Sequence, residues 1–156
     1  MFEICPLQKD DIPSLLALLR EFAIFEKLEH TFTVDNENIE RVVFEEQSVL
    51  CLIAKVEDVS VGFAIFYPVF KSFRGAKSYY LEDLYVTPSS RSKGIGYALF
   101  RAVAAKAKIA GCSRLDWQVL DWNADAIDFY NRIGGISDKG NIDFRLDGPA
   151  FEKLAG

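Results

Sequence analysis

The chain has 156 residues, enough for one domain with a hydrophobic core and too few for two domains of ordinary size. Half of the residues are hydrophobic and 26% are charged, a composition that excludes an intrinsically disordered chain. The net charge of −5 disfavours nucleic acid and anionic lipid as general partners. We therefore predict a single domain over residues 1–156 that binds neither nucleic acid nor a membrane.

The cysteine and histidine content predicts a cytoplasmic protein without a bound metal. Cys5, Cys51 and Cys112 lie far apart without a Cys-x-x-Cys pair, and His30 is the single histidine, so the common zinc-ligand sets cannot form. The N-terminus lacks a basic start before an apolar run, and no apolar stretch reaches the ~18 residues of a membrane span. We expect a soluble protein with reduced cysteines.

The first half of the chain predicts four strands, with two helices between the first strand and the second. In chain order these are a strand at 2–6, a helix from Asp10 to near His30, an amphipathic helix at 35–46, a hairpin of strands at 49–56 and 61–67, and a strand at 79–86. Asp10 and Asp11 offer N-cap oxygens to the first helix. Pro68 is expected to end the second strand of the hairpin, and Thr87-Pro88 the strand that follows.

The second half predicts alternating helices and strands. They are a helix at 94–110 closed by Gly111, a strand at 115–119, a helix at 124–132 and a last strand at 142–146. The hairpin requires antiparallel pairing, whereas the unit from 79 to 119 requires one parallel crossover. The sheet is therefore predicted to be mixed and the fold class α+β, with too little alternation for a doubly wound fold.

A glycine loop opens the helix at 94–110. Its residues 91–96 read Arg-Ser-Lys-Gly-Ile-Gly, so backbone N–H groups and the helix N-terminus can face an anion, and Arg91 and Lys93 add positive charge. A Rossmann fingerprint would need a third glycine where Leu99 stands, and a Walker A loop would need Gly-Lys-Ser/Thr in that order. The loop suits a pyrophosphate; the alternative is that its glycines only serve a strand-to-helix turn.

Two segments together resemble the GNAT acetyltransferase superfamily. The run Tyr80–Gly96, Tyr-Leu-Glu-Asp-Leu-Tyr-Val-x4-Arg-x-x-Gly-Ile-Gly, resembles its acetyl-CoA motif, and Asp121–Gly134 resembles the second half of the same signature. Within the superfamily the chain is most similar to the diamine and polyamine acetyltransferases and their thialysine-acetylating relatives, through Glu21–Glu26, Val61–Ala64 and Leu81–Asp83.

The resemblance implies a GNAT fold, which is a mixed and mostly antiparallel sheet with a splayed strand pair and flanking helices, and acetyl-CoA as co-substrate. In the family, backbone groups of the splayed strand hold the pantetheine arm and polarise the thioester carbonyl, and the glycine loop holds the pyrophosphate. The positions assigned in this way to acetyl-CoA are Leu84, Tyr85, Val86, Arg91, Ser92, Lys93, Gly94, Ile95, Gly96, Tyr97, Asn123 and Ala126.

Tyr130 is the candidate general acid for the departing thiolate. A phenol with a pKa near ~10 is protonated at neutral pH and suits a leaving group whose reference pKa is near ~8.5. Asn123, Ile127 and Tyr130 are spaced i, i+4, i+7 and share one helical face. For an arbitrary tyrosine at such spacing, core packing is the ordinary alternative.

A base is expected in the site, because an alkylamine with a pKa near ~10.4 is almost fully protonated at pH 7. The candidate for this base is Glu82. It aligns with an acidic residue that relatives place in the acceptor site, whereas His30 is expected to be an exposed residue at a helix end. Adjacent strand residues point to opposite faces, so Asp83 can join Glu82 only if the strand is bulged.

The resemblance also implies an acidic, aromatic-lined acceptor site for a cationic amine. Its residues would be Phe25, Glu26, Glu82, Asp83, Asp116 and Trp117. The three cysteines and the cluster of Phe63, Phe66 and Tyr67 are interpreted as core packing.

The predicted function is therefore an N-acetyltransferase that moves the acetyl group of acetyl-CoA to a small cationic primary amine by direct attack in a ternary complex. One alternative keeps this chemistry but takes an amino acid, an aminoglycoside or a protein N-terminus as acceptor. Another is a non-catalytic acyl-CoA-binding module. By resemblance alone, the chain is expected to form a homodimer.

Overall fold

The computed structural model describes residues 1–156, which divide into two compact units, Met1–Gln118 and Val119–Gly156. The first unit holds a five-stranded sheet in the order β1-β2-β3-β4-β5. Its strands are β1 (Phe2–Pro6), β2 (Leu50–Val56), β3 (Val59–Lys71), β4 (Ala76–Val86) and β5 (Leu115–Trp117). The first four strands pair antiparallel, and β5 runs parallel to β4. The mixed sheet and the α+β class are confirmed.

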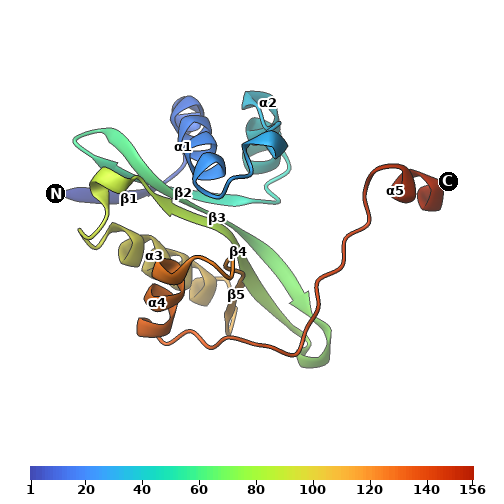
Figure 1. The fold of residues 1–156 in the computed structure, drawn as a ribbon. Helices are drawn as coiled ribbons and strands as arrows, with labels where there is room; N and C mark the ends of the chain where they lie inside the picture. Colours follow the sequence, from blue (N-terminus) through green and yellow to red (C-terminus); the bar gives the residue numbers. More distant parts are fainter. The chain divides into compact units, whose positions relative to one another are not determined.

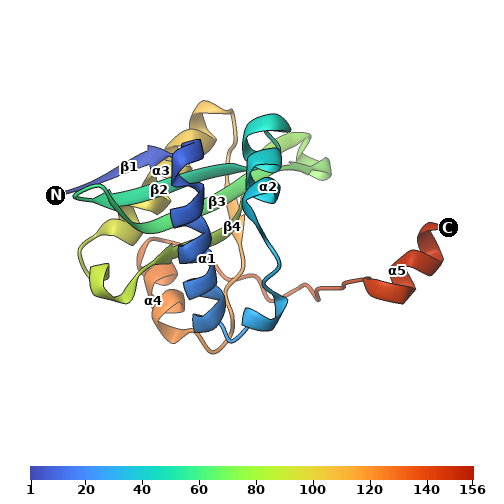
Figure 2. The same ribbon diagram turned by 90° about the horizontal axis from the view of Figure 1, so that it is seen from above.

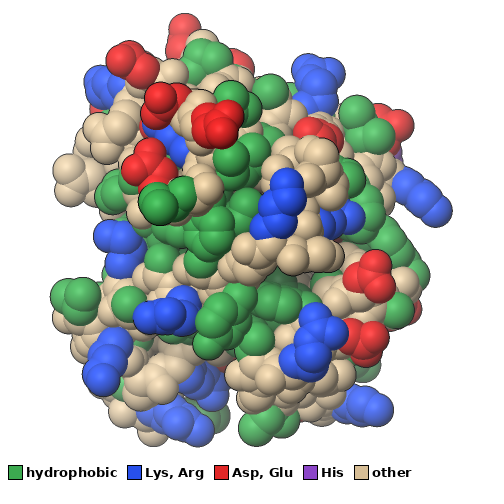
Figure 3. All heavy atoms as spheres, turned by 90° about the vertical axis from the view of Figure 1, so that its left-hand side faces the viewer, with side chains coloured by type: hydrophobic (Ala, Val, Ile, Leu, Met, Phe, Trp, Pro, Cys, Tyr) green, Lys and Arg blue, Asp and Glu red, His purple; other side chains and the backbone are tan.

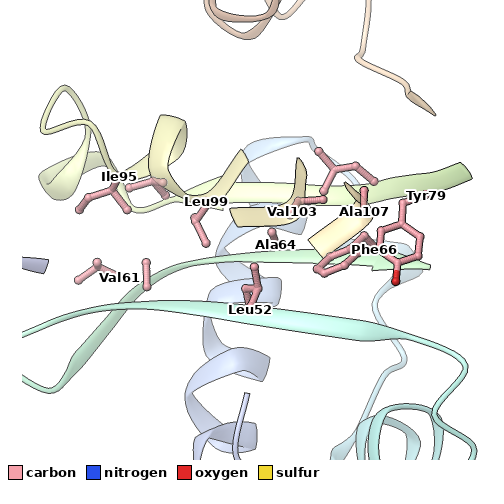
Figure 4. Packing of buried hydrophobic residues seen from close by; sticks show 12 residues of the cluster. Leu52, Val61, Ala64, Phe66, Tyr79, Ile95, Leu99, Val103 and Ala107 are labelled. Atoms are coloured by element: carbon pink, nitrogen blue, oxygen red, sulfur yellow. The ribbon is translucent and has the colours of Figure 1, made fainter. Parts of the chain in front are cut away.

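Helices cover both faces of this sheet (Figure 1). The first face is covered by α1 (Ile12–Phe25) and α2 (Asn36–Ile39), which Figure 2 shows over the same strands, and the second by α3 (Ile95–Ile109). Leu99, Val103 and Ala107 of α3 lie over buried side chains of β2 and β3 (Figure 4). The apolar stripes of both long helices therefore make the two halves of the core.

The first helix is shorter than the sequence predicts. It ends at Phe25 instead of near His30, because Lys27 takes a left-handed φ of 60° and the chain then makes a separate short 3-10 turn at Glu29–Thr31. His30 is exposed, as expected. The predicted helix at 35–46 is also divided, since a turn of π-helix at Glu40–Glu45 follows α2.

The strand β3 is longer than predicted, because Pro68 does not end it. The strand continues to Lys71, and Pro68 pairs with Tyr79 of β4. Pairing with β2 stops at Phe66, so this part of β3 is an edge, where proline's missing N–H is tolerated.

The second unit, Val119–Gly156, contains α4 (Ala124–Arg132) and α5 (Gly148–Ala155). The helix at 124–132 is confirmed, but the strand predicted at 142–146 is wrong for this single chain, where those residues form no regular element. The alternating apolar residues Ile142, Phe144 and Leu146 are all exposed. A strand pattern becomes a strand only when another strand supplies hydrogen-bond partners, and none pairs with it here.

The backbone of β4 passes close to β3 at Gly62. A Cβ added there would lie 2.7 Å from the backbone oxygen of Tyr85, so no side chain fits without moving a strand. We expect Gly62→Ala to lower the free energy of unfolding by ~1–3 kcal/mol, measured by urea denaturation.

Gly96→Ala is the control for this prediction. Its Cβ would meet only Leu84 and Val86 side-chain atoms at 3.9 Å, and alanine is favoured over glycine inside a helix. This variant should be at least as stable as the parent chain. If Gly62→Ala were equally stable, the close approach would not constrain the sheet.

Candidate active site

The glycine loop connects β4 to α3, as the sequence predicts. Ser92 and Gly94 take left-handed φ angles of 62° and 82°, so the chain turns sharply before Ile95. Gly94 is the N-cap of α3 and brings no side-chain oxygen to the amides of the first turn. These amides and the positive end of the helix are therefore available to an anion such as a pyrophosphate.

Arg91, which was expected to add positive charge at the pyrophosphate, makes contacts within the protein in this structure. Its Nε donates to the backbone oxygen of Val86 at 2.9 Å, and its guanidinium lies over the rings of Phe25 and Tyr85, at 5.1 and 5.5 Å from the ring centres. Lys93 is likewise turned back, with Nζ donating to the oxygen of Ser89 at 3.1 Å. In this structure Arg91 joins the loop to the ends of β4 and α1.

The edge of β4 that faces β5 is open over its second half. Parallel pairing joins only Tyr79–Leu81 to Leu115–Trp117, and β4 then continues to Val86 without a strand on that side. This is the splayed pair that the family resemblance implies. Backbone groups at Leu84–Val86 can accept an extended ligand in place of a strand, which fits a pantetheine arm.

A β-bulge interrupts β4 at Glu82. Asp83 pairs with Ile65 and Leu81 pairs with Phe66, so no residue of β3 opposes Glu82. Leu81 and Leu84 both pack in the cluster on the α3 face, although strict alternation would separate them. The two residues between them, Glu82 and Asp83, can therefore both lie on the α1 face. A bulge was the condition for these adjacent residues to act together, and it is present.

The side chains of Glu26, Glu82 and Asp83 form an acidic cluster beside the C-terminal end of α1. Burial, and next the charges of Glu82 and Glu26, raise the pKa of Asp83 to about 7. Burial also raises the pKa of Glu26. An acid with a pKa near neutrality, next to two carboxylates, is suited to bind a cation and to exchange a proton at physiological pH.

Tyr67 belongs to this cluster, although the sequence assigned it to core packing. Its hydroxyl donates to Oε2 of Glu82 at 2.9 Å, and it is half-buried, whereas Phe63 and Phe66 are fully buried as predicted. The signal that could have identified it is strand alternation, which turns Tyr67 to the face opposite Phe66.

A second hydrogen bond missed by the sequence analysis fixes Tyr85. Its hydroxyl donates to Oε1 of Glu21 at 2.8 Å, and its ring packs on Phe22 and Phe25 of α1. Phe25, the last residue of α1, is expected in the acceptor site. Its ring packs against Tyr85 and lies under the guanidinium of Arg91.

Asp116 and Trp117 have structural partners. The Asp116 carboxylate forms ion pairs with Lys71 and Arg114 and accepts from Ser78, and these interactions lower the pKa of Asp116 in spite of its burial. Trp117 packs edge-on against Phe100 of α3 at 5.2 Å. The negative charge of Asp116 is therefore already compensated, unlike the charges of the cluster at the bulge.

In the second unit, Asn123 at the N-cap of α4 and Ile127 and Tyr130 within the helix are half-buried, while Asp125 and Asp128 are exposed. The Oδ1 atom of Asn123 accepts from the backbone N–H of Ala126 at 3.2 Å and caps the helix. The ring of Tyr130 packs against Phe129 at 5.2 Å. The predicted helical face is confirmed.

Charges of both signs are interspersed with hydrophobic side chains on the face of the molecule in Figure 3. The net charge of −5 therefore does not make that face uniformly acidic. No group of three or more His, Cys, Asp or Glu side chains is arranged to hold a metal ion, and no helix has the length and apolar character to cross a membrane. Attraction of a charged ligand thus depends on local clusters such as the one at the bulge.

Comparison with solved structures finds the same fold elsewhere. An integron cassette protein from V. cholerae superposes with a TM-score of 0.82 at 28% sequence identity, covering 99% of this chain and 97% of that one. A ribosomal-protein-alanine N-acetyltransferase from Brucella melitensis superposes with a TM-score of 0.76 at 25% identity, covering 93% and 99% of the two chains.

Comparison of sequences gives the family. Residues 12–135 match the acetyltransferase (GNAT) family. A thialysine N-epsilon-acetyltransferase from Mus musculus is 32% identical over 161 residues, covering 96% of this chain and 94% of its own length. With the glycine loop, the open strand edge and the helix of Tyr130 in place, these matches show that the chain belongs to the GNAT family, whose enzymes transfer the acetyl group of acetyl-CoA.

Proposed function

We propose that this acetyltransferase acetylates a primary amine of a small cationic acceptor, such as a diamine, a polyamine or a thialysine-like amino acid. The observation that carries the proposal is the acidic cluster of Glu26, Glu82 and Asp83. Glu82 and Asp83 lie on β4, the strand whose open edge suits the thioester. The similarity to thialysine N-epsilon-acetyltransferases supports the same acceptor class.

The family match runs from residue 12 to residue 135 and so includes parts of both compact units. We infer that residues 1–156 work as one GNAT domain, in which Leu84–Val86 and the loop at Arg91–Tyr97 hold acetyl-CoA. For Asn123 and Ala126, the assignment to acetyl-CoA rests on the family resemblance alone. The uncapped first turn of α3 and the unpaired edge of β4 support the first part of this assignment.

The transfer is proposed to proceed by direct attack. A carboxylate of the cluster takes one proton from the ammonium group, and the neutral nitrogen then attacks the thioester carbonyl carbon. The C–S bond breaks, Tyr130 gives its proton to the departing sulfur, and the phenolate recovers the proton that the acetylated nitrogen loses. The proton held by the carboxylate passes to solvent.

The base is proposed to lie in the Glu82–Asp83 pair. The sequence favours Glu82, whose exposed carboxylate at the bulge is well placed to meet an entering amine. Asp83 has the pKa of about 7 that suits a base at neutral pH. We propose that Glu82 attracts and orients the amine and that Asp83 accepts the proton, directly or through one water.

A homodimer is also proposed. Its support is the row of exposed apolar side chains in the second unit, Ile136, Ile142, Phe144 and Leu146, whose burial against a second copy of the chain would be favourable. The acidic cluster does not depend on this assembly, because its residues all lie within Met1–Gln118.

The activity is tested by release of free thiol from acetyl-CoA over a panel of amines. Diamines and thialysine-like acceptors should turn over best, and Tyr130→Phe should lower kcat by ~10²–10⁴-fold with nearly unchanged acetyl-CoA affinity. Preference for an aminoglycoside or a protein N-terminus would change the acceptor class. Acetyl-CoA binding without thiol release from any amine would favour a non-catalytic module.

The acetyl-CoA site is tested by Gly96→Asp. The added carboxylate would stand in the first turn of α3 and repel a pyrophosphate, and its Cβ meets only ordinary contacts, so the fold should persist while binding measured by calorimetry is lost. Ala105→Asp places the same charge on an exposed position of the same helix, far from its N-terminus, and should keep wild-type affinity. Equal affinities for both variants would remove the loop from the site.

The pH dependence tests the acidic cluster. Because Asp83 must be deprotonated to accept a proton, kcat/KM should rise with pH through about 7. Glu82→Gln removes a negative charge that raises this pKa, so the rising limb should move toward lower pH, and Glu26→Gln should move it less. Asp83→Asn should abolish the limb. An unmoved limb in Glu82→Gln would place the base elsewhere.

A further inference from the structure

Tyr67 and Tyr80 form a pair of facing residues just before the bulge. They are register partners on β3 and β4, and their ring centres lie 5.6 Å apart. The half-buried ring of Tyr67 is therefore held on the sheet, and its hydroxyl reaches Oε2 of Glu82 at 2.9 Å. A hydroxyl donor on β3 thus meets a carboxylate at the bulge of β4.

Glu82 needs such a partner more than a residue in regular pairing would. No residue of β3 opposes it at the bulge, and its side chain is exposed, so a carboxylate without a partner there would turn toward water. The hydrogen bond to Tyr67 instead keeps the charge of Glu82 beside Asp83.

We propose that Tyr67 is a positioning residue of the acceptor site, whose hydroxyl holds the Glu82 carboxylate at the bulge so that Glu82 and Asp83 present a fixed pair of acidic groups to the amine. This inference rests on the proposed function, because the amine is its substrate. It adds a residue that acts through Glu82 and does not itself take part in proton transfer.

The electrostatics around Asp83 agree with this role. The charged groups that face Asp83 are Glu82 on its own strand and Glu26 at the end of α1. Burial first, and then the bond to Glu82, raise the pKa of Tyr67 to about 12, so its hydroxyl remains a proton donor throughout the working pH range. Tyr67 therefore adds no titration of its own near neutrality.

The test compares Tyr67→Phe with Tyr79→Phe. Both remove one hydroxyl from the same hairpin, but Tyr79 lies in the cluster on the α3 face, away from Glu82. The Asp83 carboxyl is titrated by carbon NMR in the full chain, and the pH profile of kcat/KM is measured with the best amine of the panel. In Tyr67→Phe the Asp83 midpoint and the rising limb should both move to lower pH, by up to about one unit, because the charge of Glu82 is no longer held nearby. Tyr79→Phe should leave both in place.

A double-mutant cycle separates positioning from a general structural effect. If Tyr67 acts through Glu82, adding Tyr67→Phe to Glu82→Gln should cause no further shift. Glu82→Asp, whose shorter side chain withdraws the carboxylate from Tyr67, should shift the Asp83 midpoint in the same direction and tests the bond even if Tyr67→Phe folds poorly.

The outcomes keep the two proposals apart. An unchanged Asp83 midpoint in Tyr67→Phe and Glu82→Asp, or an equal further shift in the Glu82→Gln background, would overturn the role of Tyr67. A parent chain that releases no thiol with any amine would overturn the proposed function, while the NMR titration would still decide whether Tyr67 holds Glu82.

Discussion

The bulge at Glu82 is the constraint on which the site depends. One additional residue in β4 shifts the register against β3, so that Leu81 and Leu84 both reach the core beneath α3. Regular alternation would have sent Glu82 and Asp83 to opposite faces. A single irregularity in hydrogen bonding therefore concentrates two negative charges on one side of the sheet.

The same position also marks where β4 leaves β5. Parallel pairing ends at Leu81, one residue before the bulge, and the backbone of β4 is then open up to Val86. The acidic pair and the open edge are thus consecutive on one strand, held against α1 by Tyr85 and its bond to Glu21. In the function proposed above, acceptor recognition and thioester binding would therefore both depend on the backbone geometry of these few residues.

The sequence predicted the features that depend on local patterns. The strand-loop-helix at the glycine loop, the helical face of Asn123 and Tyr130, and the mixed sheet follow from periodicity, caps and glycines. The bulge could only be stated as a condition, because register depends on the partner strand. The bond of Tyr67 to Glu82 depends in turn on that register, and the predicted strand at 142–146 failed because its pattern has no partner in one chain.

The open edge of β4 bears on solubility. A stretch of unpaired strand backbone is a template on which another chain can add, which is a common route to aggregation. Here the stretch is short, ends at the loop with Arg91 bound to the oxygen of Val86, and begins with two carboxylates. A pantetheine arm bound as proposed would cover the rest of this open edge and so hinder the addition of another chain. Because it would bind only the folded state, it would also stabilise that state by mass action.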